Sequence, residues 1–434
     1  MTIRNGMMAA GLAFGLAAAA PAAYGFCGFF VGKADSSLFN SASQVILARD
    51  GEHTTITMLN NYSGSLAEFA LVVPVPVVLT REQVDVVDKK VFDRIDAYSA
   101  PRLAEYYDRD PCAPPEPLPA PMMSNAARGG TMRRGVDALG VKIEESFSVG
   151  EYDILILSAT ESDGLETWLT QNGYRLPPGA ANALRPYVRQ NMKFFVAKVN
   201  LGEQAKTGYQ NLRPLQFSFD SARFMLPMRL GMLNAHGPQD LIVYVLSRKG
   251  RVESSNYRTV KLPANMDLPP YLKQGTNFRD FYRAMFDQQA QREGYRVVFT
   301  EYFWDMSWCD PCAADPLSRE ELRTAGVRWD SMGEGSASVP GGLRRPVMVP
   351  QVMLTRLHVR YTRESFPEDL VFQETGDRQN FQTRYVLQHP WTGSPSACPA
   401  AAAYFKQLAE RRQREAEMLA TLTGWPISDI RKQQ

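Results

Sequence analysis

The stretch SQVILARDGEHTTITMLNNY, residues 43–62, decides the fold of this chain. Two runs rich in apolar and β-branched residues flank an Asp-Gly pair at 50–51, which favours a tight hairpin turn. In the second run Thr54, Ile56 and Met58 alternate with other residues and so share one face of a strand. The stretch therefore predicts an antiparallel β-hairpin.

A third apolar run, residues 66–79, follows the hairpin. It contains Pro74 and Pro76, which cannot donate hydrogen bonds to a strand ladder, so this strand should end there or lie at a sheet edge. Three antiparallel strands with one apolar face predict a sandwich-like arrangement rather than a parallel sheet.

Strand-like runs alternate with short helical patterns along the rest of the chain, without regular βαβ spacing. Apolar periodicity predicts helices over 278–291 and about 401–422, with Gly424 as the stop of the second. SREE at 318–321 is a capping box and predicts a helix that starts at Ser318. We therefore expect an α+β protein with mainly antiparallel, sandwich-like sheets, several short helices and a C-terminal helix.

Changes in composition divide the 434 residues into segments. These are a signal peptide at 1–25, a β-rich part with a helix at 26–110, a proline-rich flexible insertion at 111–136, a central α+β part at 137–330, a linker at 331–350, and C-terminal strands with a helix at 351–434.

The first residues predict export. Arg4 precedes an apolar run at 7–20, and small residues allow cleavage after Ala22 or Gly25. Phe26 before Cys27 disfavours a lipoprotein. No second apolar run of membrane-spanning length follows. We expect a soluble mature protein in the periplasm or outside the cell, without a transmembrane anchor.

The charge balance gives little support for nucleic-acid binding. The formal net charge is +2 and no long basic run occurs. We therefore expect no nucleic-acid partner.

All five cysteines follow the predicted signal peptide, so an oxidising compartment makes disulfides their default state. They are Cys27, Cys112, Cys309, Cys312 and Cys398. Because five is odd, at least one has no partner within the chain. RDPC at 109–112 resembles CDPC at 309–312, which favours one bridge from Cys112 but leaves the pairing open.

SWCDPC at 307–312 resembles the motif of thiol redox enzymes. A reactive cysteine would sit at a helix start, but Pro316 and the cap at Ser318 place the helix further on. Asp305 and Asp310 add negative charge, which disfavours a thiolate. A structural bridge is therefore favoured over a catalytic Cys309–Cys312 pair. Without a second such pair a metal site is not expected, and no cofactor is predicted.

Other catalytic patterns are incomplete. The chain has neither a G-x-S-x-G elbow nor an H-E-x-x-H motif. The carboxylates Glu301 and Asp305 could flank a sugar, but a solvated acidic face is the commoner explanation. Tyr302, Trp304 and Trp308 could form an aromatic ligand surface or, at strand spacing, pack in the core.

Several motifs together resemble the DUF2330 family of secreted bacterial proteins of unknown function. They are CGFFVGKAD (27–35), VVPVPVVLTREQV (72–84), DAYSAPRLAEYYDRDPC (96–112), WLTQNGY (168–174), CDPC with PLSREEL (309–322), and RLHVRYTRESFPEDLVFQETGDRQNFQTRYVLQHP (356–390). The resemblance extends from Phe26 to Asp429. It implies a bacterial extracytoplasmic protein and assigns no catalytic residue.

The leading hypothesis is a non-catalytic binding or structural module of the cell envelope, with an envelope protein or a glycan as partner. A thiol–disulfide oxidoreductase that uses Cys309 and Cys312 is the first alternative. A carbohydrate-binding or carbohydrate-active protein is the second.

Overall fold

The computed structural model describes residues 29–32, 39–63, 69–113, 143–159, 162–171, 179–207, 212–234, 237–308, 310, 314–329 and 351–434. The predicted signal peptide (1–25), the linker (331–350) and most of the insertion (111–136) lie outside the described residues. Within them the chain is α+β, with largely antiparallel sheets and a long C-terminal helix, as the sequence predicts.

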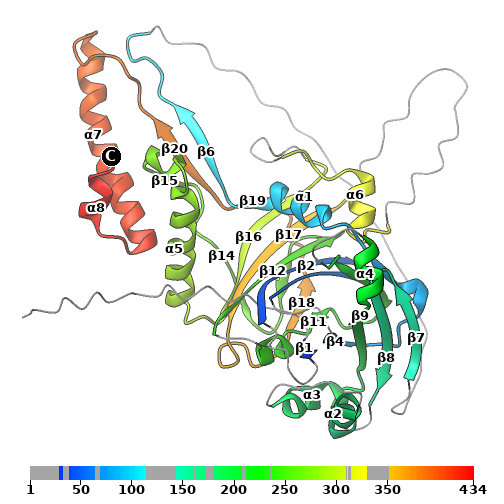
Figure 1. Ribbon diagram of the computed structural model, residues 1–434. Helices are drawn as coiled ribbons and strands as arrows, with labels where there is room; N and C mark the ends of the chain where they lie inside the picture. Colours follow the sequence, from blue (N-terminus) through cyan, green and yellow to red (C-terminus); the bar gives the residue numbers. More distant parts are fainter. Residues whose placement is uncertain are drawn as a thin grey trace, which may run out of the picture.

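The largest sheet formed by the described residues has nine strands and runs through the centre of the molecule (Figure 1). Its strands are β2 (Phe39–Asp50), β3 (His53–Ser63), β5 (Val84–Val86), β10 (Leu215–Asp220), β12 (Gln239–Ser247), β14 (Arg258–Lys261), β16 (Val297–Asp305), β17 (Met353–Tyr361) and β19 (Phe381–Gln382). Their order is β14-β16-β17-β12-β2-β3-β10-β5, with β19 beside β16. The sheet therefore takes strands from the N-terminal, central and C-terminal parts of the chain.

The predicted hairpin is confirmed as β2 and β3. Asp50 stands opposite His53, and Gly51 in the turn has a positive φ of 60°, a conformation that glycine adopts without steric cost. Ile56 and Met58 on the predicted face are buried in the main core.

A second sheet of five antiparallel strands faces the first. Its strands are β1 (Phe29–Gly32), β4 (Phe69–Val75), β7 (Ile143–Val149), β8 (Tyr152–Ser158) and β9 (Lys193–Val199), in the order β1-β4-β9-β8-β7. β1 pairs with β4 from Phe69 to Val72, and β9 pairs with the other side of β4 as far as Val75. β4 ends before Pro76, as the sequence predicts.

Alternate residues of the two sheets form one core, which makes the body of the protein a sandwich. Val45 and Leu47 of β2 belong to the same buried cluster as Ile154 of β8. The rings of Phe195 on β9 and Phe217 on β10 stack across the interface with centroids 5.2 Å apart. Burying each such side chain contributes about 1.5–3 kcal/mol.

The remaining elements are two small sheets and the helices. The first small sheet has the order β11 (Met225–Leu226), β18 (Leu370–Glu374), β13 (Val252–Ser254); the second has the order β15 (Met266–Leu268), β20 (Arg384–His389), β6 (Arg102–Tyr107). The helices are α1 (Lys90–Ser99), α2 (Ser162–Gln171), α3 (Ala180–Arg189), α4 (Leu201–Thr207), α5 (Asn277–Arg292), α6 (Arg319–Thr324), α7 (Pro399–Thr423) and α8 (Ile427–Arg431), and the 3₁₀ turns are η1 (Arg81–Gln83), η2 (Arg229–Asn234) and η3 (Pro270–Lys273).

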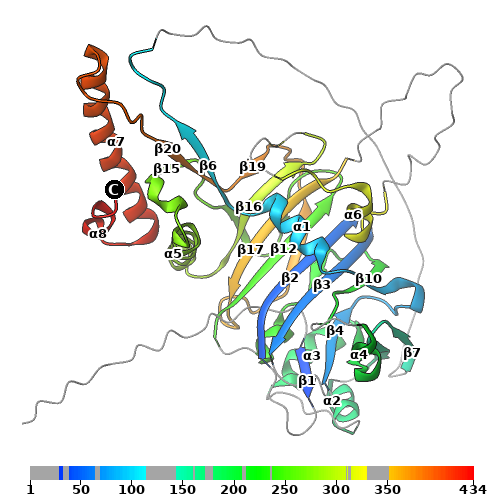
Figure 2. The same cartoon turned by 45° about the horizontal axis from the view of Figure 1, so that its top comes forward.

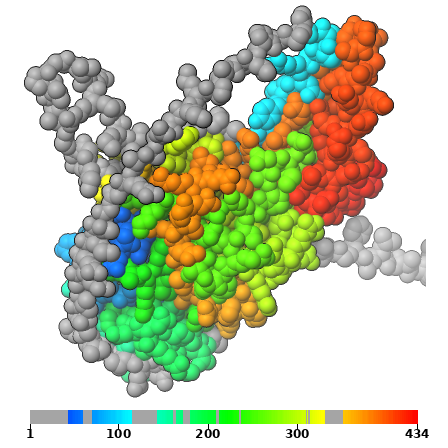
Figure 3. Space-filling model, turned by 180° about the vertical axis from the view of Figure 1, so that it is seen from behind, coloured from blue at the N-terminus to red at the C-terminus, as the bar shows by residue number. Residues whose placement is uncertain are grey.

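An arm made of β6, β15, β20, α5, α7 and α8 extends from one end of the sandwich (Figures 1 and 2). It has a core of its own, in which Phe281 and Met285 of α5 pack with Leu387 of β20 and Leu419 of α7. From behind, α7 and α8 stand out at one corner, whereas the segment containing α2 and α3 lies at the opposite end (Figure 3). The core of the arm also includes Val297 and Phe299 of β16, so the arm packs against the edge of the sandwich body.

The predicted helices are present. α5 agrees with the expected 278–291 to within one residue at each end. α6 is capped by Ser318, whose Oγ accepts from the Glu321 N–H at 3.2 Å while its own N–H donates to Glu321 Oε2 at 2.7 Å. α7 stops at Gly424, which has a positive φ of 74°. Across the described part of the chain, no helix combines the length and hydropathy that crossing a membrane requires.

Candidate functional site

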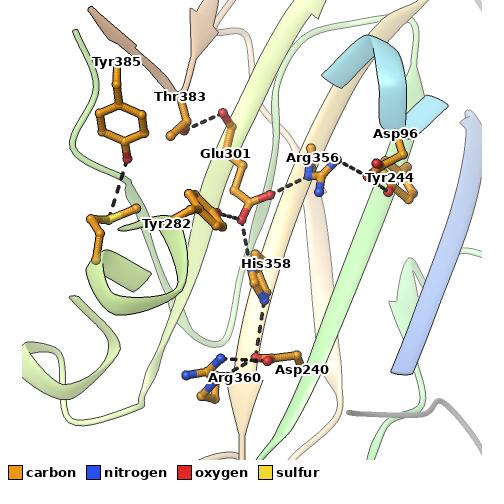
Figure 4. A network of polar contacts seen from close by, with 11 residues as sticks. Asp96, Asp240, Tyr244, Tyr282, Glu301, Arg356, His358, Arg360, Thr383 and Tyr385 are labelled. Carbon is orange, nitrogen blue, oxygen red and sulfur yellow. Dashed lines mark hydrogen bonds and ion pairs between the residues drawn. The ribbon is translucent and has the colours of Figure 1, made fainter. Parts of the chain in front are cut away.

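Glu301 on β16 is the centre of a buried ionic network where the arm meets the body (Figure 4). Its side chain is only 1% exposed. Oε1 accepts hydrogen bonds from Tyr282 Oη and from His358 Nδ1, the latter at 2.6 Å, and Oε2 accepts from Arg356 Nε at 2.5 Å. Tyr282 lies on α5 and the other two donors lie on β17, so one carboxylate joins three elements.

His358 lies between two carboxylates and an aromatic ring. Its Nδ1 contacts Glu301, and its Nε2 is 3.4 Å from Asp240 Oδ1 on β12. The imidazole stacks on Phe286 of α5, with centroids 3.8 Å apart and planes inclined by 12°. The ring is therefore held on three sides and is almost completely buried.

Arg356 carries the network to helix α1. Its Nη1 donates to Asp96 Oδ1 at 2.6 Å, and Tyr244 Oη donates to the same oxygen at 2.7 Å. The guanidinium also lies over the Tyr244 ring, 5.3 Å from its centroid, which is within the reach of a cation–π contact. These contacts fix α1 against the sheet.

Arg360 carries the network back to α5. Two of its nitrogens bind the two oxygens of Asp240 at 2.8 and 2.7 Å, a bidentate pair, and its Nη1 donates to Asp287. Its guanidinium lies 5.0 Å from the centre of the Phe286 ring. α5, which belongs to the arm, is thereby attached to β12 and β17 of the body.

The charges shift one another's pKa values. Burial alone would raise the pKa of Glu301, but His358 and Arg356 outweigh it and lower the value to about 2. Burial would likewise raise the pKa of Asp240, but His358 and Arg360 lower it to about 2. Burial would lower the pKa of His358, whereas the two carboxylates raise it to about 9. At neutral pH Glu301 and Asp240 are therefore ionised and His358 is protonated.

A carboxylate beside a histidine is a common acid–base pair, but the contacts here indicate an anchor. The donors of Arg356, His358 and Tyr282 occupy both oxygens of Glu301, and the group is buried between β16, β17 and α5. Among the described residues, no group of three His, Cys, Asp or Glu side chains is arranged to hold a metal ion. Because these buried charges neutralise one another beneath α5, they suit a structural role better than attack on a substrate.

A family description, "Uncharacterized protein conserved in bacteria (DUF2330)", matches residues 21–373. The chain belongs to the DUF2330 family. No curated protein and no solved structure matches it. The matched region contains the whole ionic network and ends before β20 and α7, whereas the motif resemblance extends to residue 429.

Two of the five candidate cysteines of this DUF2330 chain are joined. Cys112 and Cys398 form a disulfide with their Cα atoms 5.9 Å apart, although 286 residues separate them in sequence. Cys27, Cys309 and Cys312 lie outside the described residues, so their pairing and any redox role stay predictions.

The three aromatic residues of the predicted ligand surface differ in exposure. Tyr302 is 1% exposed, and its Oη donates to Asp310 Oδ2 at 3.0 Å, so it belongs to the core. Trp304 is partly buried and donates from Nε1 to the Trp308 carbonyl at 3.1 Å. Trp308 is 55% exposed and is the member that a ligand could reach. The Glu301–Asp305 pair also has separate partners, because Asp305 accepts hydrogen bonds from Ser307.

One pattern in the sequence indicates this network, although it was not among the expectations above. In RLHVRY, residues 356–361, Arg356, His358 and Arg360 alternate with buried apolar residues, so three basic side chains share one strand face. The other face of β17 packs in the sandwich core through Leu357. Three basic residues in a largely buried strand require anionic partners, but nothing in the sequence shows which strands supply them.

These pKa shifts predict how stability depends on pH. Because folding raises the pKa of His358, protonated His358 stabilises the fold. This contribution is complete below about pH 6.5, the ordinary pKa of histidine, and is lost as the pH rises to about 9. The lowered pKa values of Glu301 and Asp240 contribute above about pH 4–5, and their contribution is lost as the pH falls to about 2. We expect urea unfolding to show maximal stability near pH 5–6.5 and a loss of about 3 kcal/mol by pH 9.

His358→Gln tests whether His358 causes the loss of stability between pH 6.5 and 9, which we call the alkaline limb of the stability curve. Glutamine can still donate a hydrogen bond to Glu301 but does not titrate, so the variant should be less stable at pH 6 and flatter between pH 6.5 and 9. Equal slopes for the variant and the wild type over that range would contradict the assignment of the limb to His358.

Proposed function

We propose that this protein is an exported, disulfide-containing module of the bacterial cell envelope that binds a partner without chemical turnover. The observation that carries the proposal is the Cys112–Cys398 disulfide, which closes the end of the arm. Stable disulfides form in oxidising compartments and are rare in the cytosol. The predicted signal peptide at 1–25 supports the same location.

The ionic network supports the non-catalytic part of the proposal. Glu301 and His358 are the described groups best suited to acid–base chemistry, yet they bind each other, Arg356 and Tyr282 under helix α5. Their role in holding α5 gives the arm a fixed base, and the disulfide gives it a fixed end. A rigid arm loses little conformational entropy when a partner binds, which favours affinity.

The arm also presents aromatic rings to solvent, which favours a glycan as a second candidate partner besides an envelope protein. Tyr107 is 69% exposed and stacks on His389, with ring centroids 4.6 Å apart. Tyr106 is also exposed. Aromatic faces stack on sugar rings, so a glycan array with the mature protein separates the two kinds of partner.

Expression of the complete chain in a bacterium tests the proposal. We expect the protein in the periplasmic or secreted fraction, with its N-terminus at residue 23 or 26 after cleavage. A non-reducing peptide map should join the peptides that carry Cys112 and Cys398, and reduction should separate them. A full-length cytosolic protein with free thiols at both positions would contradict the proposal.

A further inference from the structure

We propose that a pocket between α3, η2 and the loop after β17 binds a small carboxylate with an apolar body. The pocket has a volume of about 240 Å³. Helix α3, which forms part of its wall, lies at the end of the molecule opposite the arm (Figures 1 and 2). Sites for drug-sized ligands are typically about 300–1,000 Å³, so this pocket suits a smaller molecule. The inference rests on the proposed binding role and names a ligand class for it.

Most of the wall is apolar. Pro186 lies within α3 and Phe366 in the loop, and Met232 and Leu233 come from η2. Phe366 is itself fixed by the rings of Tyr257 and Tyr361, so this side of the pocket is rigid. An apolar group of a ligand would replace water against these side chains, which favours binding by about 25 cal/mol for each Å² of apolar surface buried.

The charged residues in the wall are Arg229 and Arg363. Arg229 Nε is buried, and no described residue accepts a hydrogen bond from it; the nearest carboxylate oxygen, Asp369 Oδ2, is 3.8 Å away. Arg363 is exposed and forms no ion pair with the described residues, although the neighbouring carboxylate of Glu364 interacts with it electrostatically. Two guanidinium groups beside an apolar wall predict an anion with an apolar body.

Asp369 positions Arg229 and does not fill the pocket. Its Oδ1 accepts hydrogen bonds from Tyr187 Oη at 2.7 Å and from the backbone N–H groups of Met228 and Arg229 at 2.8 and 3.1 Å. These bonds fix the start of η2, and with it Arg229, relative to α3. The carboxylate is buried behind the wall, so it lowers the positive charge at the pocket without occupying it.

A planar carboxylate is the anion that this geometry suits best. A guanidinium binds both oxygens of a carboxylate at once, and a single carboxylate leaves room in a small pocket for an apolar group. We therefore use 4-fluorophenylacetate as the probe, with 4-fluorophenylacetamide as a neutral molecule of the same shape.

Fluorine NMR titration of the complete mature protein tests the inference. We expect saturable binding of 4-fluorophenylacetate with a dissociation constant on the order of 1 mM or tighter. The amide should bind at least about tenfold more weakly, because it cannot form the charge-assisted pair. Equal binding of acid and amide, or no saturation up to about 10 mM acid, would overturn the inference.

Variants locate the site. Arg363→Met should weaken binding of the acid by about tenfold or more without affecting folding, because this side chain is exposed. Arg229→Met should have at least the same effect, and its thermal melt shows whether it folds. Arg185→Met, an exposed residue of α3 outside the wall, is the control and should bind as the wild type does. Unchanged binding in Arg363→Met would overturn the site, whatever the peptide map shows for the disulfide and the cleavage.

Discussion

Glu301→Gln is expected to lower the free energy of unfolding by about 3–5 kcal/mol, because it leaves buried cations without their anion. The wild-type carboxylate binds both Arg356 and His358. After the change Arg356 keeps Asp96, whereas His358 keeps only the longer contact with Asp240. Glutamine has nearly the same shape as glutamate, so the loss reports the charge and not a cavity.

Urea unfolding at pH 6, followed by tryptophan fluorescence, measures the effect. The matched control is Glu203→Gln, which breaks the exposed pair with Lys206 and should change stability by less than about 1 kcal/mol. A loss of less than about 1 kcal/mol for Glu301→Gln would show that the network does not hold the fold.

Removing a cation together with Glu301 separates charge from packing. Glu301→Met combined with Arg356→Met should cost less than the sum of the two single variants, because each single variant leaves one buried charge without its partner. Additive losses would mean that the two side chains act independently.

Faster proteolysis of the arm in Glu301→Gln would further show that the network holds α5 to the body, since α5 carries Tyr282.

Local patterns were enough to predict the sandwich. The hairpin at 43–62, the end of β4 before Pro76 and the cap of α6 at Ser318 all depend on residues close in sequence, and all three are confirmed. The arm was not predicted, because its small parallel sheet joins β6, β15 and β20 from distant parts of the chain. Sequence spacing carries no information about such non-local pairing.

The candidate site shows the same limit. Glu301 was predicted to be a carboxylate in an exposed acidic face, since its neighbours in sequence include Asp305. Its partners instead come from β17 and α5, and only the order of strands in the sheet brings them together. The basic alternation in RLHVRY indicated a need for buried anions, but the identity of those anions depends on strand order.

The second large effect is expected from the disulfide. Cys398→Ser should lower the stability of the arm by about 2–5 kcal/mol, because the bond closes a loop across 286 residues and so restricts the unfolded chain. The arm should stay partly folded, since Asp108 at the end of β6 still binds Arg411 of α7 through two hydrogen bonds of 3.0 and 2.7 Å. Tyr404 Oη also donates to Asp108, at 2.6 Å.

The loss should therefore be largest at the start of α7. Amide hydrogen exchange should increase most between Cys398 and Tyr404, before the helix reaches its first contact with Asp108, and less around Leu419 in the arm core. Cys112→Ser, Cys398→Ser and the double variant all remove the same bond, so their losses should coincide and not add. A double variant clearly less stable than either single variant would show that the cysteines contribute separately, and the proposal of an arm fixed at its end by this bond would then fail.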